Sequence, residues 1–240
     1  PHHLYNELGN MHRTRGQFGK AAEYYQRTIE LNPKFADAHY NLGDVYYRMN
    51  NLHRALIEFQ SALQLEPNKY ETYNDIGAIY FDTEHPDQAA EYYQKAIDLD
   101  PFHYRAYANL ALVYYMRNDF ARAEQLYRKA LEINPNYSKA YNNLGTIYVD
   151  QKRFDKALEC FQKFLHLEPG NAEGLCNLAD VYSRQKDFAR AVDHYRKALT
   201  VNPNFTEAYS NLGSVYFEMG NDAEALAQYS RAVALNPSFA

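Results

Sequence analysis

The stretch Ala140-Tyr-Asn-Asn-Leu-Gly-Thr-Ile-Tyr-Val149 decides the fold, because recognisable copies of it recur along the chain at one fixed spacing. The segment Tyr209-Ser-Asn-Leu-Gly-Ser-Val-Tyr216 is the clearest second copy. The prolines follow the same period. Seven of the nine are evenly spaced, with numbers that increase in steps of 34: Pro33, Pro67, Pro101, Pro135, Pro169, Pro203 and Pro237. A fixed period of this length is typical of an array of stacked repeats.

The prolines set the phase of seven repeats, and a residue's position within its repeat is counted from 1 to 34. The repeats span 2–35, 36–69, 70–103, 104–137, 138–171, 172–205 and 206–239. Together they account for every residue except Pro1 and Ala240, so we expect residues 1–240 to form a single array without a second domain. In such an array each repeat buries apolar surface only against its neighbours.

The composition excludes several classes of protein. Hydrophobic residues make up 46% of the chain and the mean hydropathy is −0.65. No run approaches the roughly 20 apolar residues that a membrane span needs, so we expect a soluble chain. The net charge of −5 argues against general nucleic-acid binding. Cys160 and Cys176 lack the spacing of metal ligands and suit a reducing compartment, which favours the cytoplasm and leaves the periplasm or nucleus open.

Two helices per repeat are predicted, because apolar and small residues recur three and four apart. Positions 4, 7, 8 and 11 fall in one stripe of the first helix. Position 8 is glycine or alanine in every repeat, position 20 is always alanine and position 24 is always tyrosine or phenylalanine. A small residue beside a large ring lets two helices interlock. Proline at position 32 then prevents the second helix from continuing.

These positions resemble the signature of the tetratricopeptide repeat over essentially the whole chain. Of 56 signature places, eight in each of seven repeats, five depart: His12, Thr28, His39, Phe164 and Leu175. The resemblance implies an all-α fold, a superhelix of seven antiparallel helix pairs with a right-handed twist. Phe164 replaces a small residue at position 27, so the fifth and sixth repeats must either separate slightly or repack locally.

The opposite side of each first helix carries positions 2, 6, 9 and 13, about 180° from the packing stripe. The resemblance implies that this side lines the concave groove in which the family holds extended peptides. Asparagine offers donors and an acceptor to a peptide backbone, and it recurs at position 6. That row reads Glu7, Asn41, Asp75, Asn109, Asn143, Asn177 and Asn211. The row is also similar to the asparagine ladder in the repeat arm of O-linked N-acetylglucosamine transferases.

The same four positions concentrate negative charge. They hold eleven acidic residues, Asp44 and Asp180 among them, against four basic residues, a net charge of −7. This predicts either a partner segment rich in lysine or arginine or a solvated face without preference, and both interpretations stay open.

The middle of the groove differs from its ends. Arg105 and Lys139 lie beside an apolar group of Ala108, Leu112, Tyr115 and Met116, with Phe81 nearby. These side chains form a candidate binding hot spot or fill gaps between helices.

No motif for catalysis occurs: the chain has no His-Glu-x-x-His sequence and no glycine-rich phosphate loop. We therefore expect no enzyme, cofactor or metal site. We predict a non-catalytic scaffold that binds an extended, basic peptide or disordered segment of another protein. Two alternatives remain, the substrate-recognition arm of a larger enzyme such as a protein O-glycosyltransferase and a self-assembling structural array.

The last repeat bears on these alternatives. Its second helix carries Leu226, Tyr229, Val233 and Leu235, and no polar capping helix follows. Soluble arrays normally avoid such exposed apolar surface. We therefore expect the natural chain to continue, or this end to pack against another molecule, which includes a second copy in a homo-oligomer.

Overall fold

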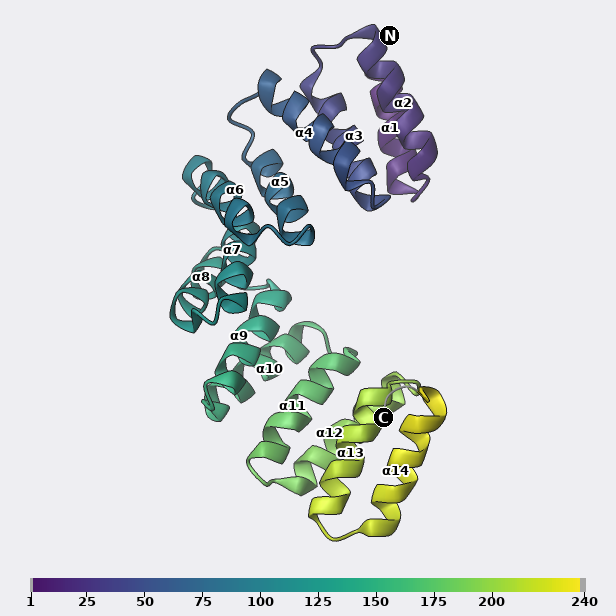
Figure 1. Cartoon of the computed structure of the whole chain (residues 1–240), viewed down its shortest axis with the longest axis vertical. Helices are drawn as coiled ribbons and strands as arrows, with labels where there is room; N and C mark the ends of the chain where they lie inside the picture. The colour runs from purple at the N-terminus through teal and green to yellow at the C-terminus, as the bar shows by residue number, and fades with distance from the viewer. Residues whose placement is uncertain (1, 238–240) are drawn as a thin grey trace. The chain divides into compact units, whose positions relative to one another are not determined.

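The computed structural model describes residues 2–237, which contain 14 α-helices in consecutive pairs (Figure 1). In all seven repeats the first helix spans positions 1–13 and the second spans positions 17–30. The predicted all-α fold of seven helix pairs is thus confirmed. Pro1 and residues 238–240, which include the last two residues of the seventh repeat, lie outside the described residues.

The helices divide between two compact units, one up to Ile133 and one from Asn134 onward. Unit 1 contains α1 (His2–Thr14), α2 (Phe18–Leu31), α3 (Ala36–Arg48), α4 (Leu52–Leu65), α5 (Tyr70–Asp82), α6 (Pro86–Leu99), α7 (Tyr104–Met116) and α8 (Phe120–Ile133). Unit 2 contains α9 (Ser138–Asp150), α10 (Phe154–Leu167), α11 (Ala172–Arg184), α12 (Phe188–Val201), α13 (Thr206–Glu218) and α14 (Asp222–Leu235). The single superhelix predicted for residues 1–240 stays a prediction.

The first helices of successive repeats contact one another inside each unit. In unit 1, α1 touches α3, α3 touches α5 and α5 touches α7. In unit 2, α9 touches α11 and α11 touches α13. Within each unit, second helices pack against the first helix of their own repeat and of the next repeat in that unit. The first helices of each unit consequently share one face.

Small residues let the two helices of a repeat approach closely, as predicted. A β-carbon added to Gly43 would lie 2.7 Å from the ring of Phe59, and one added to Gly145 would lie 2.7 Å from the ring of Phe161. Both rings are buried. Burying an aromatic side chain contributes about 1.5–3 kcal/mol, so these contacts account for much of the stability within each repeat.

The buried stripe is wider than the signature positions indicate. From the second repeat onward positions 3 and 10 are also buried, for example Ala106 and Val113 in unit 1 and Ala208 and Val215 in unit 2. The second helix of the preceding repeat covers them, since α6 packs on α7 and α12 packs on α13. Phe164 is buried too, and α10 stays packed on α11, so local repacking absorbs it.

Each turn within a repeat places position 15 in the left-handed region, with φ between 57° at Lys152 and 77° at Gly220. The amide of position 16 then donates to the carbonyl of position 11, as Asn51 does to Tyr46 at 2.8 Å. This 6→1 bond is the mark of a Schellman ending. Pro86 replaces the aromatic residue at position 17 without disturbance, because it is the first residue of α6, where no N–H is needed.

Candidate functional site

The candidate site is the first-helix face, which we define as positions 2, 6, 9 and 13 of the first helices, taken separately in each unit. Positions 6 and 9 are mostly half-buried and form the floor of this face. Positions 2 and 13 are almost all exposed and form its rims. Neighbouring first helices contact along the floor, which explains why its side chains are partly covered.

Asparagines on the floor are tied to the preceding repeat. Nδ2 of Asn109 donates to Oδ1 of Asn74 at 2.9 Å in unit 1, and Nδ2 of Asn177 donates to Oδ1 of Asn142 at 2.9 Å in unit 2. Asn41 makes a longer bond of the same kind, 3.4 Å to Asn6. The donor lies at position 6 and the acceptor at position 5. One bond fixes each amide plane and leaves its second N–H for another partner.

Arg13 brings Asn41 and Asp44 together in unit 1. Its Nη1 lies 3.1 Å from Oδ2 of Asp44 and 3.4 Å from Oδ1 of Asn41. Arg48 adds a second ion pair, with Nε 3.0 Å from Oδ1 of Asp44. Asp44 is therefore neutralised within the chain.

Asp75 lies deeper than a surface carboxylate. It accepts hydrogen bonds from the Tyr40 hydroxyl at 2.8 Å and from Nδ2 of Asn74 at 3.2 Å. Burial raises the pKa of Asp75 to about 6, with the negative charges of Asp44 and Glu71 adding to the effect and the hydrogen bonds opposing it. Burial likewise raises the pKa of the Tyr40 hydroxyl. Asp75 thus changes charge close to neutral pH.

The face is less acidic in unit 1 than its four positions indicate. Two basic residues from other positions form ion pairs with acids of the face. Arg13 pairs with Asp44, and Nζ of Lys69 lies 2.5 Å from Oδ1 of Asp37. Six acids and two bases occupy the face in unit 1, so these two additional cations change its net charge from −4 to −2. Five acids and two bases give −3 in unit 2.

The predicted apolar group lies on α7 at the end of unit 1. Leu112 and Tyr115 are half-buried, and Met116 is 63% exposed. The Tyr115 ring centroid lies 5.9 Å from that of Phe120 at the start of α8. The guanidinium of Arg105 lies over the ring of its neighbour Tyr104, 5.8 Å from the centroid.

Lys139 and Asn143 belong to α9 in unit 2, where Lys139 is exposed and Asn143 is half-buried. The binding role assigned to these residues and to the α7 group stays a prediction.

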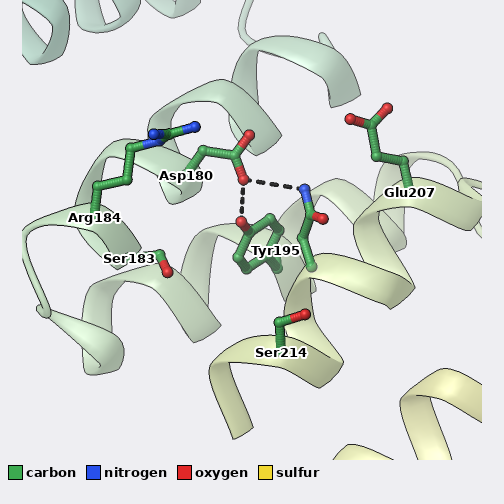
Figure 2. A pocket seen from close by; sticks show the side chains of 7 residues that line it. Asp180, Ser183, Arg184, Tyr195, Glu207 and Ser214 are labelled. Carbon is green, nitrogen blue, oxygen red and sulfur yellow. Dashed lines mark hydrogen bonds between the residues drawn. The ribbon is translucent and has the colours of Figure 1, made fainter. Parts of the chain in front are cut away.

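Asp180 and Asn211 meet beside a polar pocket in unit 2 (Figure 2). Nδ2 of Asn211 donates to Oδ1 of Asp180 at 3.2 Å, and the Tyr195 hydroxyl donates to the same oxygen. Burial raises the pKa of Asp180, and the charge of Glu207 adds to this while the Tyr195 bond opposes it. The pocket measures about 350 Å³, and its lining is Asp180, Ser183, Arg184, Tyr195, Glu207, Asn211 and Ser214.

Sequence reasoning missed the residues that organise the floor. Position 5 lies between the packing stripe and the first-helix face, so Asn6, Asn74 and Asn142 were assigned to neither. Their recurrence in alternate repeats, the first, third and fifth, is the signal that could have revealed them. Arg13 occupies position 12, outside both stripes.

Residues 2–237 contain no group of three or more histidine, cysteine or acidic side chains that could hold a metal ion. Within that range, no helix has both the length and the apolar character needed to cross a bilayer.

Solved structures with the same fold are numerous but distant in sequence. The chain superimposes on a structure of the APC/C hetero-tetramer Cut9–Hcn1 with a TM-score of 0.80 and 19% identity, covering 90% of this chain and 43% of that one. Pseudomonas aeruginosa PilF superimposes with a TM-score of 0.75 and 21% identity, covering 84% of this chain and 92% of PilF. YrrB, described as a TPR protein with an unusual peptide-binding site, superimposes with a TM-score of 0.63 and 20% identity. The match covers 75% of this chain and 93% of YrrB.

Family models match along the chain, whereas no curated protein does. One tetratricopeptide repeat model matches residues 34–101 and 136–204, a second matches 74–138 and 176–238, and a TPR repeat model matches 9–50. The helix pairs, the close glycine–aromatic contacts and these matches agree. The chain belongs to the tetratricopeptide repeat family.

Proposed function

We propose that this chain is a non-catalytic scaffold that binds an extended peptide or disordered segment of a partner protein along its first-helix face. The fold itself supports a protein-interaction role in general. The observation that carries the finer proposal is the set of floor asparagines, whose amides are fixed by one bond to the preceding repeat. A fixed amide meets a peptide backbone with little further loss of side-chain entropy.

The two rims favour an extended and basic partner. Acidic residues exceed basic ones on the face of each unit even after Arg13 and Lys69 are counted. A field of this sign attracts lysine-rich and arginine-rich segments and weakens as salt screens it. Cys160 and Cys176 are buried, and two cysteines without metal-type spacing are compatible with a reducing compartment such as the cytoplasm.

A peptide-array screen of the purified chain at low and high salt tests this proposal. We expect binding to extended basic peptides that weakens as salt rises. Binding to none of the peptides at either salt concentration would contradict the proposal. Equal binding at both salt concentrations would contradict the preference for basic peptides but not peptide binding by the first-helix face.

A self-assembling array is the second candidate, favoured by apolar side chains exposed at both ends of the described chain. Leu4 on α1 is 71% exposed and Leu226 on α14 is 68% exposed, and both lie where a further repeat would stack. Light scattering over a concentration series decides it, because mass should rise with concentration if copies stack. A recognition arm of a larger enzyme stays a prediction, tested by the sequence of the full-length protein.

A further inference from the structure

Two repeats carry the same triad on the first-helix face. Asparagine at position 6, aspartate at position 9 and arginine at position 13 occur together only in the second repeat, as Asn41, Asp44 and Arg48, and in the sixth, as Asn177, Asp180 and Arg184. The asparagine of each triad donates to an asparagine at position 5 of the preceding repeat. Unit 1 and unit 2 therefore offer an internal comparison of one arrangement.

In unit 1 this arrangement holds a guanidinium. Arg13 comes from position 12 of the preceding repeat and donates to Oδ2 of Asp44 and to Oδ1 of Asn41. We call this pair of acceptors, one at position 6 and one at position 9, the guanidinium seat. The same nitrogen, Nη1, donates to both acceptors, which lie three residues apart on α3.

In unit 2 the same seat lacks its cation. Position 12 of the preceding repeat is Val149, which has no donor. Oδ1 of Asp180 accepts from Tyr195 and Asn211, as the dashed lines in Figure 2 show, while Oδ2 points away from both. Arg184 lines the same pocket and its positive charge acts on Asp180, yet among residues 2–237 no ion pair joins the two side chains and no hydrogen bond reaches Oδ1 of Asn177.

The surroundings of this seat favour a cation from outside. The Asp180 side chain is half-buried, and a charge-assisted bond from a guanidinium compensates for the water that its carboxylate has lost. Glu207 lines the adjoining pocket and extends the negative field. The pocket opens the way to Asp180 from solvent.

We propose that Asn177 and Asp180 form a guanidinium seat for an arginine of the partner peptide, which takes the place that Arg13 fills in unit 1. This inference rests on the peptide-binding function proposed above and names the side chain that the face selects. An arginine is favoured over a lysine because the cation in the equivalent place of unit 1 is a guanidinium, which is more weakly hydrated than an ammonium and forms strong charge-assisted bonds to carboxylates.

The test is an NMR titration of the full chain with N-acetyl-arginine methylamide, read at the side-chain amide signals of Asn177 and Asn211. N-acetyl-citrulline methylamide, a neutral analogue of nearly the same shape, is the matched ligand control. We expect saturable shifts with the arginine probe and at least tenfold weaker binding of the citrulline probe. Equal shifts with the two probes, or none with either, would overturn the seat.

Variants supply the matched protein controls. Val149→Arg places a cation where unit 1 has Arg13, and Asp180→Asn removes the charge while keeping an acceptor for Tyr195. Both substitutions should weaken binding of the arginine probe at least tenfold. Arg13→Gln should open the seat in unit 1 and add a second site, read at the Asn41 amide. Unchanged binding in Val149→Arg would contradict the proposal.

Peptides separate this inference from the function beneath it. Suppose that peptides bind equally well with arginine or with citrulline, and that the arginine probe causes no shifts. This result would contradict the guanidinium seat but not the scaffold proposal. If the arginine probe binds at Asn177 but no peptide binds, the result would support the guanidinium seat and contradict the scaffold proposal.

Discussion

The ring of Phe164 fills the space that a β-carbon on Gly174 would occupy, because a carbon built there lies 2.4 Å from Cε1 of the ring. Phe164 comes from position 27 on α10 and Gly174 from position 3 on α11. In the other pairs of adjacent repeats within a unit, both positions are small: Thr28 with Ala38, Ala62 with Thr72, Ala96 with Ala106, and Ala198 with Ala208. The missing methyl group on one helix compensates for the added ring on the other.

This compensation predicts a strong coupling between the two residues. Gly174→Ala alone should destabilise the protein by about 1–3 kcal/mol, since the ring must move. In a Phe164→Ala background the same change should cost nothing or stabilise, because the added methyl fills the vacated space. A double-mutant cycle followed by urea unfolding measures the coupling. The same cost in both backgrounds would contradict the pairing.

The left-handed turns predict two stabilising substitutions. Lys152 and Lys186 have φ of 57° and 61° at position 15, where Gly16 and Gly220 stand in other repeats. Glycine adopts this conformation without the steric cost that a lysine incurs. Lys152→Gly and Lys186→Gly should each raise stability by about 0.5–1 kcal/mol despite the added chain entropy.

Thermal unfolding measures this gain. Lys156→Gly, inside α10, is the matched control and should instead lower stability by about 1 kcal/mol. Destabilisation by all three substitutions would show that the turn conformation is not what limits stability.

Replacing the Thr72 hydroxyl with an apolar group should increase the stability of the protein. Its hydroxyl is fully buried without a hydrogen-bond partner, where four other repeats have a buried alanine at position 3. A buried unsatisfied hydroxyl costs about 1–3 kcal/mol. Thr72→Val keeps the shape and should raise the free energy of unfolding by about 1 kcal/mol in urea titrations. Thr72→Ser, which keeps the hydroxyl and loses a methyl, should lower it.

Asp75 predicts a pH-dependent stability. Its pKa of about 6 in the folded chain exceeds its ordinary value of 3.8, so the folded state binds more protons between these limits. Stability should therefore fall as pH rises from about 4 to about 6 and stay lower above that. Asp75→Asn should stabilise by about 1–2 kcal/mol at pH 7.5, a figure reduced because the side chain is partly exposed.

The same substitution should have a much smaller effect at pH 4, where Asp75 is protonated in the folded state and partly protonated in the unfolded state. Denaturant unfolding at the two pH values measures the difference. An equal gain at both would assign the effect to packing and not to charge.

The 34-residue period, together with the three- and four-residue spacing inside it, was enough to predict the helices, because every repeat carries one pattern of small, aromatic and proline positions. Pro33 and its equivalents end each second helix, and Gly43 or Gly145 mark where an aromatic ring approaches. Position 15 escaped prediction because Glu84, Lys152 and Lys186 do not themselves favour a left-handed turn. The Schellman geometry around them imposes it.

The candidate site was predicted only in outline. A helical wheel places Asn109 and Asn177 on one face, yet it considers each helix alone. Their bonds to Asn74 and Asn142 join adjacent repeats, so they depend on how repeats stack. The same limit hid Arg13, whose charge reaches Asp44 from a different helix.

The most direct measurement of the central claim is the affinity of the best-binding array peptide for the Asn109→Ala/Asn177→Ala double variant, by fluorescence anisotropy. Asn68→Ala/Asn204→Ala, which alters exposed turn asparagines off the face, is the matched control. Binding along the floor predicts at least a tenfold loss in the first variant and none in the second, with helicity unchanged in both. Unchanged affinity in Asn109→Ala/Asn177→Ala would contradict peptide binding by the first-helix face.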